Sequence, residues 1–294
     1  MSFDLICILG PTASGKTKFA VQMALGCNGE IISADSRQVY RGMDIGTGKD
    51  LAEYRVTLST GEVLEVPYHL IDIAEAGEKY NLFRYQSDFS RTYDDIVSRG
   101  KTPILCGGTG LYIEAVTGGY SLPEVPENVE LRRELEKKSL EELTCMLKDL
   151  KALHNTTDTD SKKRVVRAIE IELYKQQNPE TIAYTHSRKL NTRFIGMLVE
   201  RDERNARIDR RLKERLEGGL VEEVKKLLDS GLTPEDLIYY GLEYKFVTQY
   251  IIGIISYEDM VRALETAIHQ FAKRQMTWFR GMERRGVQIE WVRP

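Results

Sequence analysis

Eight consecutive residues near the N-terminus have the types and spacing of a phosphate-binding loop. They fit the pattern G-x-x-x-x-G-K-[ST] and are Gly10, Pro11, Thr12, Ala13, Ser14, Gly15, Lys16 and Thr17. Small residues let successive backbone N–H groups surround phosphate oxygens, while Lys16 supplies a positive charge and Thr17 can hold a magnesium ion. A helix that begins near Gly15 adds its positive end. The alternative is a chance glycine turn, but every fixed position is present, so the sequence predicts binding of a di- or triphosphate.

A carboxylate at the end of the second predicted strand is a candidate general base. Asp35 directly follows the strand expected at residues 30–34, and in an open α/β sheet ligands bind at the carboxyl ends of the strands. An anionic side chain beside bound phosphates is unfavourable unless it serves as a base, a metal ligand or a hydrogen-bond acceptor. The structural alternative is a turn or capping aspartate before Ser36. As a general base, Asp35 could accelerate a reaction by roughly 10²–10⁴-fold.

A glycine-rich loop, residues 107–110 (GGTG), follows the strand expected at residues 103–106. Many phosphate-loop ATPases place an acidic metal ligand at this strand end, and this sequence has none there. Two interpretations stay open. The glycines could allow close approach of a bulky ligand that Thr109 hydrogen-bonds, or they could form a tight turn between strand and helix.

Basic side chains gather at the starts of two predicted helices, and a polar stripe with two basic residues runs along a third. The arrays are Lys162, Lys163, Arg164 and Arg167, then Arg201, Arg204, Arg207, Arg210 and Arg211, and finally the stripe of Gln270, Lys273, Thr277 and Arg280. Such arrays can bind several phosphates of a nucleic acid or of a small ligand. The alternative for each is a solvated helix face paired with neighbouring acids.

The elements that must position these residues alternate between strand and helix. Strands are expected at residues 3–9, 30–34, 68–73, 103–106 and 194–199, and helices at 16–25, 81–99, 161–177, 202–217, 219–230, 235–252 and 257–280. Asn81 and Ser139 have the positions of helix caps. The pattern predicts an α/β fold with a doubly wound, mainly parallel sheet of the P-loop NTPase type. We expect a core of residues 1–115 plus 191–294, with a mainly helical insertion at 116–190.

Composition restricts the function classes. The formal net charge of −3 argues against bulk electrostatic capture of nucleic acid, although a local basic face remains possible. The four cysteines are scattered, which predicts neither a zinc site nor a disulfide framework. Because neither a membrane span nor a signal-type segment is evident, we expect a cytoplasmic protein without membrane contact. A monomer is expected as well, although the sequence does not show the oligomeric state.

Taken together, these motifs closely resemble those of the tRNA dimethylallyltransferases, in order and over nearly the whole chain. The matching segments are residues 10–17, 35–47, 107–112, 164–170 and 272–280. The resemblance implies transfer of a dimethylallyl group from dimethylallyl diphosphate to N6 of the adenosine 3′ of the anticodon, with Mg²⁺ as cofactor and the tRNA anticodon stem-loop as partner. The phosphate loop would then hold a diphosphate rather than ATP.

The resemblance also implies roles for individual residues. Asp35 would be the general base, with Thr12 and Arg211 at the diphosphate and the active centre, and Thr17 at the metal. The helical insertion would bind tRNA. The residues implied to contact tRNA are Asp35, Ser36, Arg37, Gln38, Thr109, Arg132, Lys163, Arg164, Val165, Val166, Arg167, Lys273 and Arg274.

This chain departs from the family pattern in two segments. Residues 51–67 form a longer segment than in many relatives, and we expect a surface hairpin there. This departure does not weaken the catalytic assignment, and the role of residues 48–67 stays open. Residues 238–243 replace a more basic segment, which leaves their contact with tRNA open. Three other functions remain to be tested: prenylation of free adenine nucleotides, a small-molecule kinase, and an RNA-binding module without catalysis. The basic insertion favours a macromolecular acceptor over a free nucleotide.

Overall fold

The computed structural model describes residues 3–152, 157–180, 184 and 188–293. The chain divides into two compact units. The core unit comprises Met1–Tyr120 and Ser187–Pro294, and the helical unit comprises Ser121–His186. Among the described residues, no helix combines the length and the apolar character needed to cross a membrane.

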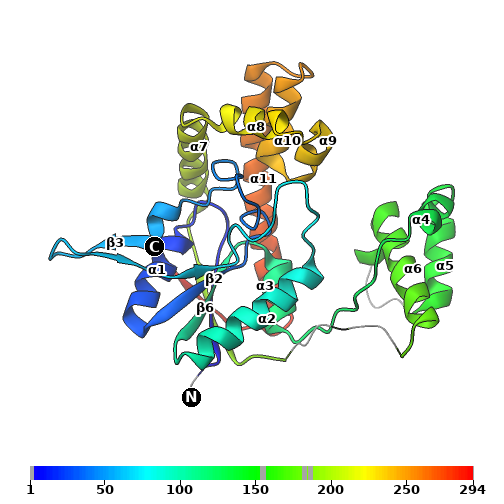
Figure 1. Cartoon of the computed structure of the whole chain (residues 1–294), viewed down its shortest axis with the longest axis horizontal. Helices are drawn as coiled ribbons and strands as arrows, with labels where there is room; N and C mark the ends of the chain where they lie inside the picture. Colours follow the sequence, from blue (N-terminus) through cyan, green and yellow to red (C-terminus); the bar gives the residue numbers. More distant parts are fainter. Residues whose placement is uncertain (1–2, 153–156, 181–183, 185–187, 294) are drawn as a thin grey trace. The chain divides into compact units, whose positions relative to one another are not determined.

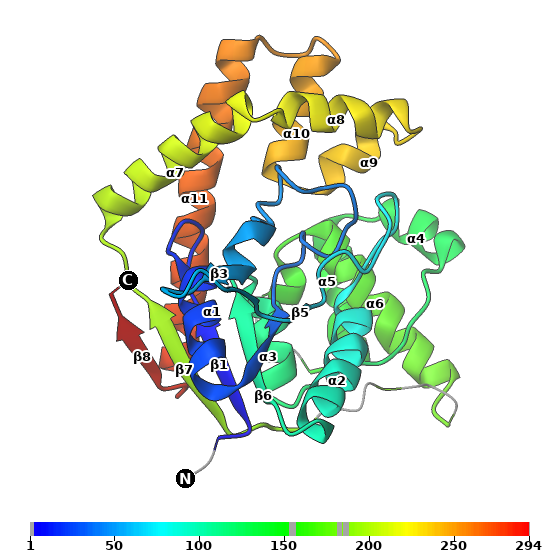
Figure 2. The ribbon, with the colours of Figure 1, turned by 60° about the vertical axis from the view of Figure 1, so that its left-hand side comes forward.

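A six-stranded parallel sheet forms the centre of the core unit, in the order β5-β2-β6-β1-β7-β8. Its strands are β1 (Leu5–Leu9), β2 (Gly29–Ser33), β5 (Tyr68–His69), β6 (Thr102–Gly107), β7 (Thr192–Met197) and β8 (Ile289–Val292). The expected parallel α/β fold is confirmed. The strand expected at 68–73 is shorter, because Leu70 and Asp72 have positive φ angles of 60° and 55° that end the extended backbone. Strand β8, beside β7 at the sheet edge in Figure 2, escaped the sequence analysis.

Helices cover both faces of this sheet (Figure 1). The helical elements of the core unit are α1 (Lys16–Cys27), η1 (Leu51–Tyr54), α2 (Leu82–Ser98), α3 (Gly110–Thr117), α7 (Arg201–Glu217), α8 (Leu220–Asp229), α9 (Pro234–Tyr239), α10 (Leu242–Ile251) and α11 (Tyr257–Arg284). Successive strand side chains point to opposite faces. Leu5 and Leu9 therefore join the apolar core that includes Phe279 of α11, whereas Ile8 joins the core that includes Ala20 of α1.

Local signals set several helix ends as expected. The side chain of Asn81 caps α2 by accepting a hydrogen bond from the backbone N–H of Arg84 at 2.9 Å. The single helix expected at 235–252 is wrong, because the chain forms α9 and α10 with a break at Gly241. The φ angle of Gly241 is 123°, in a region that L-residues with side chains avoid.

The segment after η1 forms the expected hairpin. Strands β3 (Arg55–Thr57) and β4 (Val63–Glu65) pair antiparallel, with Val56 opposite Leu64. The hairpin is mostly exposed, but η1 at its base reaches the cavity described below.

The helical unit contains α4 (Val129–Glu136), α5 (Leu140–Leu150), η2 (Thr157–Thr159) and α6 (Lys162–Gln177). The capping box expected at Ser139 is present, since its side chain accepts from the N–H of Glu142 while the Glu142 carboxylate accepts from the N–H of Ser139. Leucines of α5 pack against the apolar face of α6 to form a small core. This unit has an apolar core of its own.

Candidate active site

The loop after β1 has the backbone of a phosphate cradle, and we call residues 10–17 the P-loop. Ala13 and Gly15 have positive φ angles of 60° and 78°, and α1 begins directly after Gly15. A Cβ atom on Gly10 would lie 2.7 Å from the hydroxyl oxygen of Ser14, so only glycine fits there. The loop therefore aims backbone N–H groups and the positive end of α1 at one point.

Polar groups of the P-loop are left without strong protein partners. The Ser14 hydroxyl is buried and has no hydrogen-bond partner among the described residues. Among the described residues, the Lys16 ammonium reaches only the carbonyl oxygen of Pro11, at 3.4 Å. Burial lowers the pKa of Lys16, which the negative charge of Asp35 partly opposes. A bound anion would satisfy these groups and favour the charged lysine.

A cavity of about 590 Å³ opens beside the P-loop, and we call it the phosphate cavity. The residues that line it are Ala13, Ser14, Gly15, Lys16, Thr17, Ile45, Asp50, Glu53, Arg207, Arg210, Arg211, Glu214, Arg215 and Gly218. Four arginines on α7 thus face the loop that the sequence predicted to bind phosphate. Arg215 was missed, although its i,i+4 spacing from Arg211 could have indicated it. Arg201 and Arg204, named in the same array, do not line the cavity.

Two carboxylates from η1 and the residue before it also line the phosphate cavity. Glu53 faces the cavity with Asp50 and the hydroxyl-bearing Thr17. Burial raises the pKa of Glu53, as does the charge of Asp50, while Arg211, Lys16 and a hydrogen bond with Thr17 oppose the shift. Carboxylate and hydroxyl oxygens are the ligands that Mg²⁺ prefers, so this donor set fits a magnesium ion. Glu53, within the segment 51–67 whose role the sequence left open, thus lines the phosphate cavity.

The arginines of α7 are held by the loop that follows residues 35–47. Arg211 forms an ion pair with Asp50 and donates to the carbonyl oxygen of Gly48 at 3.4 Å. A Cβ atom on Gly48 would overlap the guanidinium of Arg215. Arg215 also contacts the Glu243 carboxylate at 3.5 Å, and burial raises the pKa of Glu243. Glu243, in the divergent segment 238–243, thus supports an arginine of the cavity.

Asp35 lies at the carboxyl end of β2, and its geometry is compatible with both roles considered for it. Its Oδ1 accepts a hydrogen bond from the backbone N–H of Arg37 at 2.9 Å, which is the turn role. Its Oδ2 has no hydrogen bond to any described residue, so one oxygen remains able to accept a substrate N–H. Asp35 is not among the residues that line the phosphate cavity.

The loop after β6 joins the ends of β1 and β2, because β6 lies between these two strands. Thr109 accepts a hydrogen bond from the backbone N–H of Ser36 at 3.1 Å, and its own N–H donates to Ala34. Two of its glycines allow other parts of the core unit to approach closely. A Cβ atom on Gly107 would overlap the backbone of Ala34, and one on Gly110 would overlap Trp278. Both interpretations of this loop are thus compatible with its geometry.

Gln275 of α11 is a site residue that the sequence analysis missed. It is buried, accepts a hydrogen bond from the N–H of Thr12 and donates one to the carbonyl oxygen of Gly108. A Cβ atom on Gly108 would overlap the Gln275 amide. Its place within the family-like segment 272–280 was the available signal, but its partners are far away in the sequence.

Some residues expected to contact tRNA support the backbone of the core unit. Gln38 donates to the carbonyl oxygen of Gly48 at 3.1 Å and lies next to Ser33, so its amide is already occupied. The Arg37 guanidinium lies 5.8 Å from the ring centroid of Tyr239. Lys273 and Arg274 are exposed on α11, where Arg274 lies over the ring of Phe271.

The other expected tRNA contacts belong to the helical unit. Glu170, which is buried, binds both Arg132 and Arg167, and it accepts from the N–H of Asn128 at 2.6 Å. Exposed Arg164 pairs with Asp160 at 3.0 Å. Lys163 is exposed, whereas the side chains of Val165 and Val166 are buried in the core of this unit. Basic groups therefore mark the start of α6, and its two valines serve packing.

Comparisons with known proteins show the family of this chain. The model of the IPP transferase family matches residues 38–282, and that of the isopentenyl transferase family matches residues 3–58. A tRNA dimethylallyltransferase 1 of Parabacteroides distasonis is 60% identical, over 99% of this chain and 92% of that protein. A tRNA dimethylallyltransferase 2 of Syntrophotalea carbinolica is 50% identical, over 99% of this chain and 95% of that protein.

Solved structures of tRNA-modifying transferases also resemble this chain. The full-length tRNA isopentenylpyrophosphate transferase of Bacillus halodurans is 34% identical with a TM-score of 0.69, over 99% of this chain and 90% of that chain. A eukaryotic dimethylallyltransferase acting on tRNA shares the fold, with a TM-score of 0.75 at 24% identity, over 99% of this chain and 74% of that chain.

Proposed function

The chain belongs to the IPP transferase family and transfers a dimethylallyl group to tRNA, and on that premise we propose how its site does so. The proposed donor is dimethylallyl diphosphate, bound with its diphosphate in the phosphate cavity. The proposed acceptor is N6 of the adenosine 3′ of the anticodon. The observation that carries this proposal is the arrangement of the P-loop opposite four arginines of α7 across one cavity.

Diphosphate binding in this cavity follows from charge and hydrogen bonding. The N–H groups of the P-loop and the positive end of α1 face the anion from one side. Arg207, Arg210, Arg211 and Arg215 face it from the other, where planar guanidinium groups bind phosphate oxygens in pairs. The buried Ser14 hydroxyl gains the partner it lacks.

The reaction breaks the bond between C1 of the dimethylallyl group and the diphosphate oxygen, and it forms a bond between C1 and N6. Negative charge grows on the departing diphosphate, where Lys16 and the α7 arginines stabilise it. A magnesium ion held by Thr17 and Glu53 would neutralise part of the same charge. This donor needs no attacking water.

Asp35 takes the proton that N6 loses as the new bond forms. Its Oδ2 is available, while the Oδ1 contact with Arg37 fixes the orientation of the carboxylate. The loop at residues 107–110 binds Ser36 directly and binds Gln275, which in turn binds the P-loop at Thr12. These contacts fix the distance between Asp35 and the diphosphate site. Thr12 helps to hold the P-loop in place, because its backbone N–H donates a hydrogen bond to Gln275.

The acceptor base must leave the anticodon stack to reach Asp35, which costs a few kcal/mol. Aromatic and guanidinium planes favour such unstacked bases, and Arg37 over Tyr239 offers both. Lys163, Arg164 and Arg167 supply positive charge for the phosphate backbone, together with Lys273 and Arg274.

The test is a transfer assay with Mg²⁺, radiolabelled dimethylallyl diphosphate and an unmodified tRNA transcript. We expect label in the tRNA, mapped to the adenosine 3′ of the anticodon, and none in a transcript with guanosine at that position. Label in AMP alone would instead assign a nucleotide-prenylating enzyme. Phosphate transfer from ATP without prenyl transfer would assign a kinase, and tRNA binding without turnover a binding module.

A further inference from the structure

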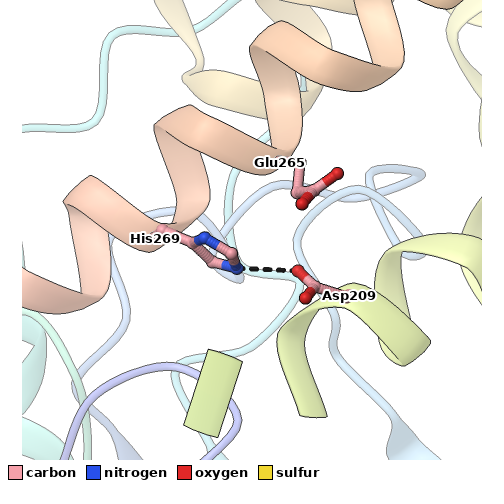
Figure 3. Close-up of side chains that lie close together, drawn as sticks. All are labelled: Asp209, Glu265 and His269. Carbon is pink, nitrogen blue, oxygen red and sulfur yellow. Dashed lines mark hydrogen bonds and ion pairs between the residues drawn. The ribbon is translucent and has the colours of Figure 1, made fainter. Parts of the chain in front are cut away.

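Three side chains of the types that ligate metals lie close together, and none of them lines the phosphate cavity. Figure 3 shows Asp209 of α7 facing Glu265 and His269 of α11. One ligand atom of each residue lies within 4.8 Å of the other two. Glu265 and His269 are four residues apart and therefore share a helix face. We propose that these three side chains bind a divalent transition-metal ion, with Zn²⁺ as the best match.

The charges around this cluster favour a cation. Two carboxylates converge from different helices, and the hydrogen bond of 2.7 Å between His269 Nε2 and Asp209 Oδ1 is the contact that joins them. Within the described chain, no lysine or arginine forms an ion pair with Asp209 or Glu265. Other acids on α7 do have such partners, as in the pair of Glu203 with Arg207. With a neutral imidazole, the cluster carries two uncompensated negative charges that one divalent ion would balance.

The donor set selects the kind of metal. One imidazole nitrogen and two carboxylate oxygens suit Zn²⁺ and its neighbours, whereas Mg²⁺ and Ca²⁺ prefer oxygen ligands alone. Donors bound to Zn²⁺ at 2.0–2.1 Å stand roughly 3.3 Å apart in a tetrahedron. His269 Nε2 and Asp209 Oδ1 are already closer than this, so the ion takes the place of the proton between them, which moves to Nδ1 of the neutral imidazole. Glu265 then completes the site by a small rotation. The cluster is partly exposed, so water can fill the remaining position.

The position of this site gives the ion a mechanical role. Apolar side chains already join α7 and α11, with Ile208 and Leu212 packed against Leu264 and Ile268. Asp209 lies between the cavity residues Arg207 and Arg210 in the sequence. A metal ion across the two helices would therefore fix the helix that carries the cavity arginines. This inference is independent of the proposed transfer reaction.

The test is titration of the full-length, metal-depleted protein with Zn²⁺ by calorimetry, in buffer that contains Mg²⁺. We expect one Zn²⁺ per chain and a higher thermal transition temperature for the loaded protein. His269→Asn and Glu265→Gln should each weaken binding by more than the roughly 10–100-fold that loss of a supporting group costs a metal site. Both variants should keep the thermal transition of the metal-free protein, because the apolar contact between α7 and α11 is unchanged.

A matched control is His69→Asn. His69 also contacts a carboxylate at 2.7 Å, but that carboxylate, on Glu30, is already bound by Arg99. No third ligand from the described part of the chain completes a site there. This variant should bind Zn²⁺ like the unchanged protein. Absence of stoichiometric Zn²⁺ binding would overturn the proposal. Zn²⁺ binding that survives both cluster substitutions would also overturn it. In that case, a sulfur charge-transfer band after replacement of Zn²⁺ by Co²⁺ would assign the ion to a cysteine such as exposed Cys145.

Discussion

The side-chain oxygen of Gln275 accepts a hydrogen bond from the backbone N–H of Thr12 at 2.8 Å. The amide nitrogen of the same side chain donates to the carbonyl oxygen of Gly108 at 3.0 Å. A single residue of α11 therefore joins the P-loop to the loop that follows β6. The side-chain amide supplies both a donor and an acceptor, whereas a carboxylate lacks the donor and an apolar side chain lacks both groups.

Gln275→Glu should weaken diphosphate binding and lower turnover. A carboxylate facing the Gly108 carbonyl leaves that oxygen without its donor and adds negative charge beside the P-loop. We expect a cost of about 1–3 kcal/mol, which corresponds to roughly 5- to 150-fold in affinity measured by calorimetry with inorganic diphosphate. Gln270→Glu, an exposed position on the same helix, is the control. Equal effects of both changes would show that helix charge, rather than the two hydrogen bonds, is responsible.

Glu53→Gln should reduce the Mg²⁺ dependence of diphosphate binding. Glu53 is the carboxylate of η1 that faces the cavity with Thr17. We expect the amide variant to need at least roughly tenfold more Mg²⁺ to reach the same diphosphate affinity. Diphosphate titrations at several Mg²⁺ concentrations measure this. Glu62→Gln, at the exposed hairpin tip, should have no effect. Tighter diphosphate binding by Glu53→Gln would mean that the carboxylate only repels the anion.

Gly48→Ala should disturb the arginines of the phosphate cavity. The φ angle of Gly48 is +64°, and a Cβ atom there would overlap the Arg215 guanidinium and lie 2.8 Å from that of Arg211. Gly42→Ala is the matched control, because Gly42 has a φ of +71° but no atom within 4 Å of the added carbon. Both variants should lose about 1 kcal/mol of stability from backbone strain. Only Gly48→Ala should also lose diphosphate affinity, and equal affinity in both would contradict the contact.

Asp35→Asn should separate chemistry from binding. Asparagine keeps the oxygen that accepts from the Arg37 N–H, so the turn is preserved while the base is removed. We expect single-turnover transfer to fall by roughly 10²–10⁴-fold, with tRNA affinity nearly unchanged in a filter-binding assay. A parallel fall in affinity would assign Asp35 a positioning role.

Stability should depend on pH through Glu30. The hydrogen bond from Arg99 is the main cause that lowers the pKa of Glu30 from 4.5 to about 2, and His69 adds to it. The lowered pKa stabilises the folded protein above the ordinary carboxyl pKa, and this stabilisation is lost as the pH falls toward 2. Glu30→Gln should therefore cost on the order of 2 kcal/mol at neutral pH, allowing for solvent screening of Arg99.

Urea unfolding of Glu30→Gln and the unchanged protein at several pH values checks this prediction. The difference between their free energies of unfolding should shrink as the pH falls from neutral toward 2. A difference that stays constant with pH would contradict the ion pair as the cause. Glu290→Gln, which breaks the exposed pair with Arg193, should change stability little at any pH.

Features set by neighbouring residues were accessible from the sequence. The P-loop follows from the spacing of its glycines, Lys16 and Thr17, and the caps at Asn81 and Ser139 depend on residues three positions away. The alternation of strands and helices indicated the parallel sheet, which in turn placed Asp35 at a carboxyl edge. These local patterns work because helix capping, loop geometry and side-chain alternation act over a few residues.

Tertiary structure alone decided which distant groups meet at the site. Glu53 reaches the P-loop because η1 folds back at the base of a hairpin, and Gln275 lies 263 positions from Thr12 in the chain. Buried Glu170 binds Arg167 one helical turn away, which the spacing could indicate, but it also binds Arg132, which lies 38 positions away and meets it only in the folded unit. The same holds for Asp209, whose approach to His269 depends on packing between α7 and α11. Such pairings are set by the packing of whole elements, and their chemistry becomes readable only once those elements are in place.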